Sequence, residues 1–292
     1  MPGLTIHAGS YAAMFRPDAG MLCASLSYAG DEYVVWPRTL AEFRAGKATA
    51  MPLVHPWANR LARFGYRTAG RRVDLHGVAL PLDPNGLPLH GNLFGAAFAV
   101  LRSEPARVIA KLEYGADPNR LRAFPFPHDL IVDARVDAQR GLTIATIVRP
   151  TSDRAVPISF GWHPFLCLPG IARSEWTLHW PACEHVELDS RLIPTGRRTA
   201  QPAEAAPIGS RTFDDHYALG RAKRFGISAE GRGVTLRFDG HYPFAQLFVP
   251  PRRQLVAIEP MTAEINALGH DRAPIAEPGS TFRAAFTIAV TR

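Results

Sequence analysis

Short stretches in which apolar and polar residues alternate one by one recur along this chain. A period of two is that of a β-strand with one buried and one exposed face. In residues 129–137, for example, Leu130, Val132, Ala134 and Val136 alternate with charged side chains at every intervening position except Ile131. The same alternation occurs at residues 107–113, 234–239 and 282–290. Because Gly, Pro and Asp separate these stretches, the pattern predicts an all-β sandwich or barrel of antiparallel strands.

Helices and long loops are expected in few places. Residues 39–46 predict two turns of helix, because Thr39 is suited to cap the first turn and Gly46 to end the last. Residues 197–210 combine small residues with prolines, which favours a long surface loop. The strand patterns on both sides of this segment are alike. We therefore expect a single domain over residues 1–292.

The net charge of +7 is dispersed along the chain. Only Lys47, Lys111 and Lys223 are lysines, and basic residues never form a run of five or more. A nucleic-acid surface usually combines clustered basic residues with a recognisable motif. Nucleic acid is therefore not expected as a partner.

The cysteines and the apolar stretches indicate the class of protein. Cys23, Cys167 and Cys183 are odd in number and lack C-x-x-C spacing, which argues against a disulfide framework or a structural zinc site. Cys167 follows His163 by four residues, but a small buried hydrophobe is the favoured interpretation. No apolar run approaches the ~18 residues that span a bilayer, and no secretory signal is apparent. We expect a soluble cytoplasmic protein with no membrane partner.

Five polar residues stand out because of their surroundings. His163 and Glu259 lie in apolar segments, and each is followed directly by proline. A carboxylate and an imidazole at strand ends are suited to moving protons between two oxygens of one small polar molecule. The other three are Arg60, His90 and Asp214.

Each of these five residues also has a structural interpretation. A histidine on an apolar strand is usually a hydrogen-bonded core residue. Glu259 could be an exposed carboxylate at a strand end, Asp214 could anchor a turn, and Arg60 could form an ion pair. Their joint occurrence favours a functional site over five separate structural roles.

Taken together, the motifs around these residues resemble those of the aldose 1-epimerases, also called galactose mutarotases. The resemblance covers almost the whole chain, and its specificity comes from the order and distances of five motifs. These are Asn59-Arg60 before Gly65-Tyr66, Leu89-His90-Gly91 before Gly95, Trp162-His163-Pro164 within residues 157–166, Phe213-Asp214 before Tyr217, and Ile258-Glu259-Pro260 before Thr262.

The resemblance implies a large antiparallel β-sandwich with few short helices, and a role for each matching residue. His163 matches the family's general acid and Glu259 its general base. Arg60, His90 and Asp214 match positions that hold the hydroxyls and ring oxygen of the sugar. Asp214 is a better match than Asp215 because of its spacing to Tyr217.

The implied reaction is the interconversion of the α and β anomers of a free aldose. Glu259 would take the proton of the anomeric hydroxyl while His163 protonates the ring oxygen, so the ring opens, rotates about C1–C2 and closes again. This chemistry needs no metal, nucleotide or redox cofactor, and its partner is a small sugar. Oligomeric state and the sugar's identity stay open.

Three other functions are compatible with parts of the pattern. A hexose-6-phosphate 1-epimerase would use the same acid and base with a phosphate contact. A sugar-binding protein of the same fold would keep Arg60, His90 and Asp214 without turnover. A glycoside hydrolase would require two carboxylates across the scissile bond, whereas His163 and Glu259 supply one carboxylate and one imidazole.

Overall fold

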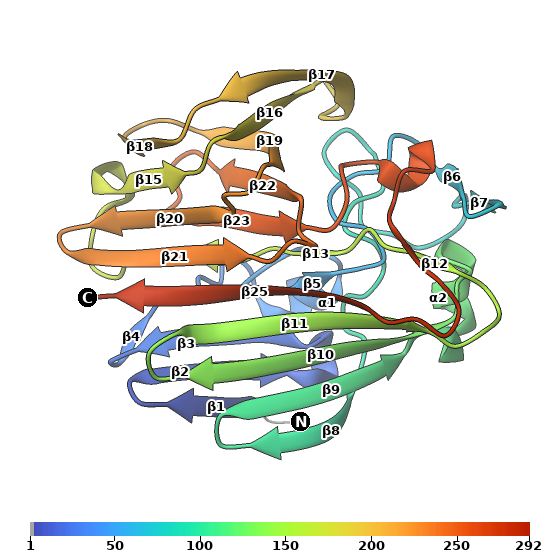
Figure 1. Cartoon of the computed structure of the whole chain (residues 1–292), viewed down its shortest axis with the longest axis horizontal. Helices are drawn as coiled ribbons and strands as arrows, with labels where there is room; N and C mark the ends of the chain where they lie inside the picture. Colours follow the sequence, from blue (N-terminus) through green and yellow to red (C-terminus); the bar gives the residue numbers. More distant parts are fainter. Residues whose placement is uncertain (1–2) are drawn as a thin grey trace.

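The computed structural model describes residues 3–292 and confirms the predicted all-β fold (Figure 1). Its largest sheet has nine antiparallel strands. In sheet order they are β18 (Glu204–Pro207), β15 (Thr177–Trp180), β20 (Arg224–Ala229), β21 (Arg232–Phe238), β25 (Phe282–Thr291), β11 (Gly141–Pro150), β10 (His128–Asp137), β9 (Arg107–Glu113) and β8 (Ala99–Glu104).

A second antiparallel sheet of eight strands carries most of the predicted site residues. Seven of its strands follow one path, and β14 (Phe165–Leu166) pairs with β23 beside that path. Along the path they are β17 (Pro194–Gln201), β16 (Cys183–Leu188), β19 (Phe213–Leu219), β22 (Phe244–Val249), β23 (Val256–Met261), β13 (Gly161–Trp162) and β5 (Leu53–Val54).

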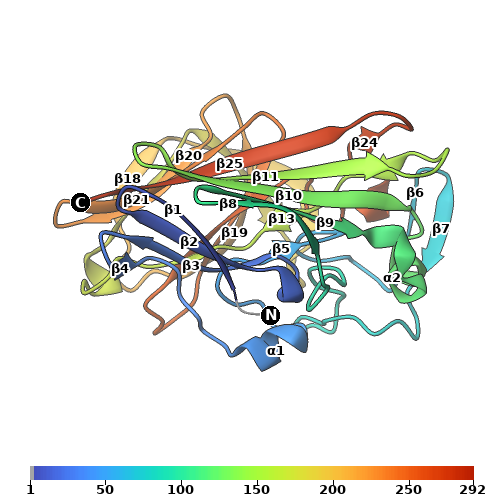
Figure 2. The same ribbon diagram turned by 90° about the horizontal axis from the view of Figure 1, so that it is seen from below.

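A smaller N-terminal sheet and two strand pairs complete the β-structure. The N-terminal sheet contacts β9, β10 and β11, and Figure 2 shows it as a separate blue layer. Its strands are β1 (Leu4–Ala8), β2 (Tyr11–Arg16), β3 (Leu22–Tyr28) and β4 (Asp31–Glu32). The pairs are β6 (Gly65–Thr68) with β7 (Arg71–Asp74), and β12 (Val156–Pro157) with β24 (Ile275–Ala276).

Helical segments are few and short. They are α1 (Leu40–Arg44), α2 (Pro118–Ala123) and the 3₁₀ turns η1 (Pro17–Ala19), η2 (Tyr114–Ala116), η3 (Arg173–Glu175) and η4 (Ala267–His270). Within residues 3–292, none of the helices has the length and apolar character to cross a membrane.

Aromatic residues join the two large sheets. Trp162 of β13 is fully buried, and its ring centroid lies 5.9 Å from that of Phe286 in β25. Its indole N–H donates to the hydroxyl of Thr146 in β11 at 2.9 Å. Large aromatic side chains contribute strongly to core stability because each buries ~150–250 Å². The packing of Trp162 therefore fixes the position of the next residue, His163, relative to the nine-stranded sheet.

The strands and the helix predicted from the sequence are confirmed. Residues 129–137 lie in β10, where Leu130, Val132 and Ala134 are buried. The stretches at 107–113, 234–239 and 282–290 correspond to β9, β21 and β25. Thr39 caps α1 through a reciprocal capping box with Glu42. That residues 1–292 form a single domain stays a prediction.

The surface loop predicted at residues 197–210 is wrong. Most of it belongs to β17 and β18, each of which lies at an edge of one of the large sheets. Nearly all of β17 is exposed, so its sequence lacks the alternation that a half-buried strand needs. Backbone pairing with β16 orders it instead, and β18 pairs with β15 in the same way.

Two glycines with similar backbone angles test the packing of the nine-stranded sheet. Gly141 has a φ of 88°, and an added Cβ would lie 2.2 Å from the carbonyl oxygen of Ile288 on β25. Gly231 has a φ of 78° with nothing within 4 Å of its Cβ position. Left-handed backbone costs either alanine variant ~1–2 kcal/mol, but only G141A also forces two strands apart.

We expect G141A to lower the free energy of unfolding by at least ~1–3 kcal/mol more than G231A, as overpacking does. Urea unfolding of both variants measures the difference. Equal losses would contradict the close contact between β11 and β25.

Candidate active site

Three neighbouring strands of the eight-stranded sheet present polar side chains on one face. Glu259 of β23 pairs directly with Gln246 of β22, and Gln246 pairs with His216 of β19. Asp214 precedes His216 by two residues, so it shares that face. Figure 1 shows the three strands side by side. The sheet register therefore brings Asp214 and Glu259 to the same surface.

His163 reaches this surface from the end of β13. Gly161 in that strand pairs with Met261 of β23. A Cβ on Gly161 would lie 2.6 Å from the carbonyl oxygen of Pro260, so glycine permits this close approach of the two strands. The imidazole of His163 stacks on Phe165, with ring centroids 4.2 Å apart. Both the backbone and the ring of His163 are therefore constrained.

Arg60 and His90 lie in two loop segments that bind each other. The backbone N–H of His90 donates to the Asn59 carbonyl at 2.9 Å, and the Asn59 N–H donates to His90 Nδ1 at 3.2 Å. Asn59 and His90 have φ angles of 59° and 58°, a conformation that typically costs ~1–3 kcal/mol and concentrates at functional sites. The fixed geometry therefore presents His90 in one orientation.

The backbone at Gly91 is approached closely by the chain itself. A Cβ on Gly91 would lie 2.2 Å from the His55 carbonyl oxygen. The φ of 71° at this position also favours glycine. Gly91 thus holds the His90 segment against the segment that leads to Arg60.

The hydrogen bond at His90 also defines its chemistry. Burial lowers the pKa of His90 well below its ordinary value, and the neighbouring His163 and Arg60 lower it further. Because Nδ1 accepts from Asn59, the neutral ring carries its proton on Nε2. His90 is therefore available as a neutral hydrogen-bond donor.

His163 and Glu259 are in direct contact. Nε2 of His163 lies 3.2 Å from Oε1 of Glu259, and both side chains are buried. Within residues 3–292, His163 Nδ1 and Glu259 Oε2 have no hydrogen-bond partner. Buried polar atoms are normally hydrogen-bonded. Two unpartnered atoms at one acid–base contact single it out as a candidate site for a polar ligand.

Burial favours the neutral form of both partners. Loss of solvation lowers the pKa of His163 from 6.5 to about 3. Burial likewise raises the pKa of Glu259 well above its ordinary value; Asp214 raises it further and Arg60 partly opposes the shift. Burial therefore favours a neutral imidazole at His163 and a protonated carboxyl group at Glu259, whose facing atoms lie 3.2 Å apart.

Arg60 lies between two carboxylates. Its Nε donates to Asp83 Oδ2 at 2.7 Å, and its Nη2 lies 3.5 Å from Asp214 Oδ2. The Gln246 amide donates to Asp214 Oδ1 at 2.6 Å. Burial raises the pKa of Asp214, although Arg60 opposes this shift. Because the Asp214 side chain is 33% exposed and that of Arg60 only 8%, Asp214 lies at the open side of the group.

The five residues predicted from the sequence thus lie in one connected group. His163 contacts Glu259, its ring lies 5.3 Å from that of His90, and Arg60 links Asn59 to Asp214. We call these five side chains the site cluster: Arg60, His90, His163, Asp214 and Glu259. The role of each member in a reaction stays a prediction.

Sequence reasoning missed two residues that contact the site cluster. Asp83 begins Asp83-Pro84-Asn85-Gly86, which has the composition of an ordinary turn. Gln246 is the one polar residue of β22, and that position in an apolar strand was a usable signal. The role of each residue beside the site cluster becomes apparent only through its contact, that of Asp83 with Arg60 and that of Gln246 with Asp214.

Two residues that neighbour the site cluster in sequence have other partners. Asp215 Oδ1 lies 3.2 Å from Nε2 of His185. The thiol of Cys167 donates to the Glu32 carbonyl at 3.5 Å, and burial raises its pKa to about 12. These contacts agree with the preference for Asp214 over Asp215 and with a structural interpretation of Cys167.

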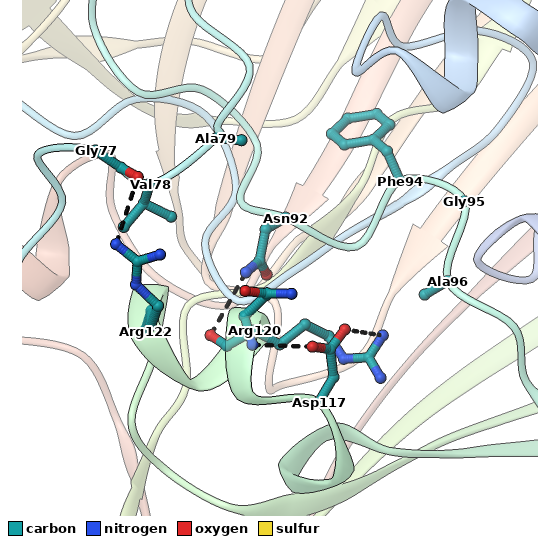
Figure 3. Close-up of a pocket in the computed structure, with 11 residues that line it drawn as sticks. Gly77, Val78, Ala79, Asn92, Phe94, Gly95, Ala96, Asp117, Arg120 and Arg122 are labelled. Atoms are coloured by element: carbon teal, nitrogen blue, oxygen red, sulfur yellow. Dashed lines mark hydrogen bonds and ion pairs between the residues drawn. The ribbon is translucent and has the colours of Figure 1, made fainter.

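A cavity of about 540 Å³ lies beside α2, and none of the five predicted residues lines it (Figure 3). Arg122 donates to the Gly77 carbonyl at 3.4 Å, and Arg120 lies 3.4 Å from Asp117. The arginines of this cavity thus already have oxygen partners. In the described part of the chain, no group of three or more His, Cys, Asp or Glu side chains could hold a metal ion.

Comparison with known proteins identifies a family. The model of the aldose 1-epimerase family matches residues 4–289, nearly the whole chain. The comparison with curated proteins gives no match.

Similar solved structures share the fold at low sequence identity. A galactose mutarotase-like protein from Clostridium acetobutylicum has a TM-score of 0.85 and 17% identity, over 98% of this chain and 94% of that one. A GalM/aldose epimerase homologue from C. elegans has a TM-score of 0.81 and 18% identity, over 99% of this chain and 98% of that one. Galactose 1-epimerase from Lactobacillus acidophilus NCFM has a TM-score of 0.75 and 13% identity, over 97% of this chain and 92% of that one. These likenesses show the galactose mutarotase-like fold.

Burial of His163 predicts a dependence of stability on pH. In the unfolded chain His163 binds a proton near pH 6.5, whereas in the folded protein its pKa is lowered to about 3. The contribution of His163 to the free energy of unfolding therefore has its full value above pH 6.5 and decreases as the pH falls toward about 3. In H163Q, the free energy of unfolding should fall less steeply between about pH 6 and pH 4, by up to ~1.4 kcal/mol per pH unit. Urea unfolding at several pH values measures this slope. An unchanged slope would contradict a buried neutral imidazole.

Proposed function

Since the chain belongs to the aldose 1-epimerase family, we propose that it interconverts the α and β anomers of a free aldose by opening and closing the sugar ring. The observation that carries the proposal is the buried contact of 3.2 Å between His163 Nε2 and Glu259 Oε1. Anomers differ only in the configuration at C1, and ring opening, which interconverts them, moves two protons and breaks one C–O bond. An acid and a base in contact are suited to that exchange.

In the proposed mechanism, the pair supplies both the base and the acid. Transfer of the carboxyl proton of Glu259 to His163 produces a carboxylate and an imidazolium. The carboxylate takes the proton of the anomeric hydroxyl, and His163 gives its proton to the ring oxygen as the C1–O5 bond breaks. After rotation about C1–C2, the reverse transfers close the ring on the other face. The protein regains its starting proton, and no electrons are gained or lost.

The other members of the site cluster supply hydrogen bonds to the sugar. The guanidinium of Arg60 and the Nε2–H of His90 are donors, and the carboxylate of Asp214 is an acceptor. Hydroxyl groups both donate and accept, so a polyhydroxylated ring suits this mixed set. Asp214, which lies at the open side, would contact a hydroxyl far from the reacting carbon.

The charges of the site cluster favour an uncharged sugar over a hexose 6-phosphate. A phosphate is usually bound by an arginine that can offer two parallel N–H groups. Arg60 is instead paired with Asp83 and Asp214 at 2.7 Å and 3.5 Å. A phosphate placed here would meet two carboxylates that compete for the same cation. The free aldose is therefore the better candidate.

A sugar-binding protein without catalytic turnover is a further interpretation of this site. It would need Arg60, His90 and Asp214, but it would gain nothing from an acid–base contact buried in the sheet. Burying a carboxyl group and an imidazole has a desolvation cost. Their presence in direct contact favours catalysis.

Polarimetry of freshly dissolved α-D-glucose and α-D-galactose tests the proposal. Protein should accelerate the approach to the equilibrium rotation near neutral pH. H163A and E259Q should each lose about 10²- to 10⁴-fold in rate, which is the usual contribution of a placed acid or base. The E259Q variant should still bind sugar, because an amide preserves the shape of the carboxyl group.

The matched control is D215N, whose carboxylate lies next to Asp214 in sequence but pairs with His185. It should retain the wild-type rate. Full activity of E259Q would exclude Glu259 as the base. If the wild type accelerates neither sugar, exchange between the anomers of glucose 6-phosphate, followed by NMR, tests the phosphosugar alternative. Sugar binding without exchange of either substrate would favour the non-catalytic protein.

A further inference from the structure

Asp83 is a buried carboxylate outside the predicted site that uses both of its oxygens. Oδ2 accepts from Arg60 Nε at 2.7 Å. Oδ1 accepts from the backbone N–H groups of Asn85 and Leu87 at 2.9 Å and 2.8 Å. The carboxylate is fully buried and is fixed by its own turn. These bonds hold the pKa of Asp83 below its ordinary value although burial alone would raise it.

The turn that fixes Asp83 belongs to the same loop as His90. Asp83 N–H donates to the Leu87 carbonyl, and residues of this loop form a bridge between Leu89 and Arg60. His90 then donates to the Asn59 carbonyl. The loop that carries Asp83 and His90 is therefore joined to Arg60 twice. Leu89 pairs with the Arg60 backbone, and Asp83 binds the Arg60 guanidinium through a charged hydrogen bond.

The hydrogen bonds of Arg60 divide its guanidinium into an anchored part and a free part. A guanidinium has five N–H donors. Nε is used by Asp83, one donor of Nη1 by Asn59 Oδ1 at 2.8 Å, and Nη2 faces Asp214 at 3.5 Å. Within residues 3–292, this leaves one donor on each terminal nitrogen for another acceptor. The bond to Asp83 decides where those two donors lie, because it fixes the Nε end of the planar group.

We infer that Asp83 is a positioning residue, which orients Arg60 so that its terminal N–H groups meet the hydroxyls of the sugar. The inference rests on the proposed function, since it assigns Arg60 to the substrate. Asp83 itself touches no substrate in this arrangement and acts through Arg60.

A purely structural role is the competing explanation, and stability alone does not separate the two. A buried ion pair is weak evidence for stabilisation, because desolvation of both charges offsets their attraction. Loss of one partner, however, leaves a buried charge unpaired and destabilises any protein. The decisive readouts are therefore KM against kcat, and whether the effect of Asp83 depends on Arg60.

The test compares D83N, R60A and the double variant D83N/R60A with the wild type. Arg60 is assigned to hydroxyls that are bound before and during ring opening, and loss of such uniform binding raises KM with little change in kcat. We expect D83N to raise KM for the aldose about tenfold, since a misplacement of ~1 Å is enough for effects of this size. In the R60A background, D83N should add less than a further twofold, because residues that act through one another are not additive.

The matched control is D133N on β10 in the nine-stranded sheet. Asp133 accepts two hydrogen bonds from Arg107, both at 2.9 Å, and two from Arg135 at 3.3 Å and 3.1 Å, in a partly buried group of ion pairs. D133N should lower the Tm as D83N does and leave KM unchanged. An unchanged KM in folded D83N, or an equal effect of D83N with and without Arg60, would overturn the inference.

A second measurement separates failure of this inference from failure of the proposed function. In ¹H–¹⁵N spectra, the Nε–H of Arg60 should exchange slowly with solvent in the wild type and rapidly in D83N. If the wild type shows no mutarotation, the proposed function fails, but loss of this protection together with a weaker affinity for aldoses would still support the positioning role. Protection retained in D83N would overturn it whatever the activity.

Discussion

The register between β22 and β23 is the constraint on which the site depends. Gln246 and Glu259 face each other across this ladder, and Phe244 faces Met261. A slip of one residue would turn every side chain of a strand to the opposite face. Glu259 would then leave His163, and the row that continues through Gln246 to His216 would be broken. The close contact of Gly161 with the Pro260 carbonyl fixes the same strand from its other side. The arrangement of the site cluster is thus specified first by backbone pairing.

Charge in the site cluster is arranged to limit the number of ionised groups. Arg60 is compensated by Asp83 and Asp214. Burial favours the neutral forms of both Glu259 and His163. In the proposed mechanism, charges form in that pair only during ring opening and closing. Fixed hydrogen bonds around such a pair cost no reorganisation at the moment of reaction. In the proposed mechanism, the burial that shifts both pKa values would therefore also prepare the pair for proton transfer.

Much of the fold and the membership of the site cluster could be predicted from the sequence, for a physical reason. Strands such as β10 bury one face, so the alternation of Leu130, Val132 and Ala134 records their environment. Edge strands such as β17 bury almost no side chains, so their sequence shows no alternation and predicts exposure but not a strand. The site cluster was found through motifs around Arg60, His90, His163, Asp214 and Glu259. Asp83 could not be found in this way, because an aspartate that binds its own turn has the same local sequence whether or not it also holds an arginine.

The position of β25 determines when the site cluster can be assembled during synthesis of the chain. This strand comprises residues 282–291, yet it lies in the interior of the nine-stranded sheet between β21 and β11. Its partner β11 was synthesised long before it, as the pairing of Leu142 with Ile288 illustrates. Pairings between distant segments are slow because a long loop must close first. Trp162 packs on Phe286 of this same strand, so the support beneath His163 is completed only when the ribosome has released these residues. A nascent chain that already contains all five members of the site cluster therefore still lacks the surface that aligns them.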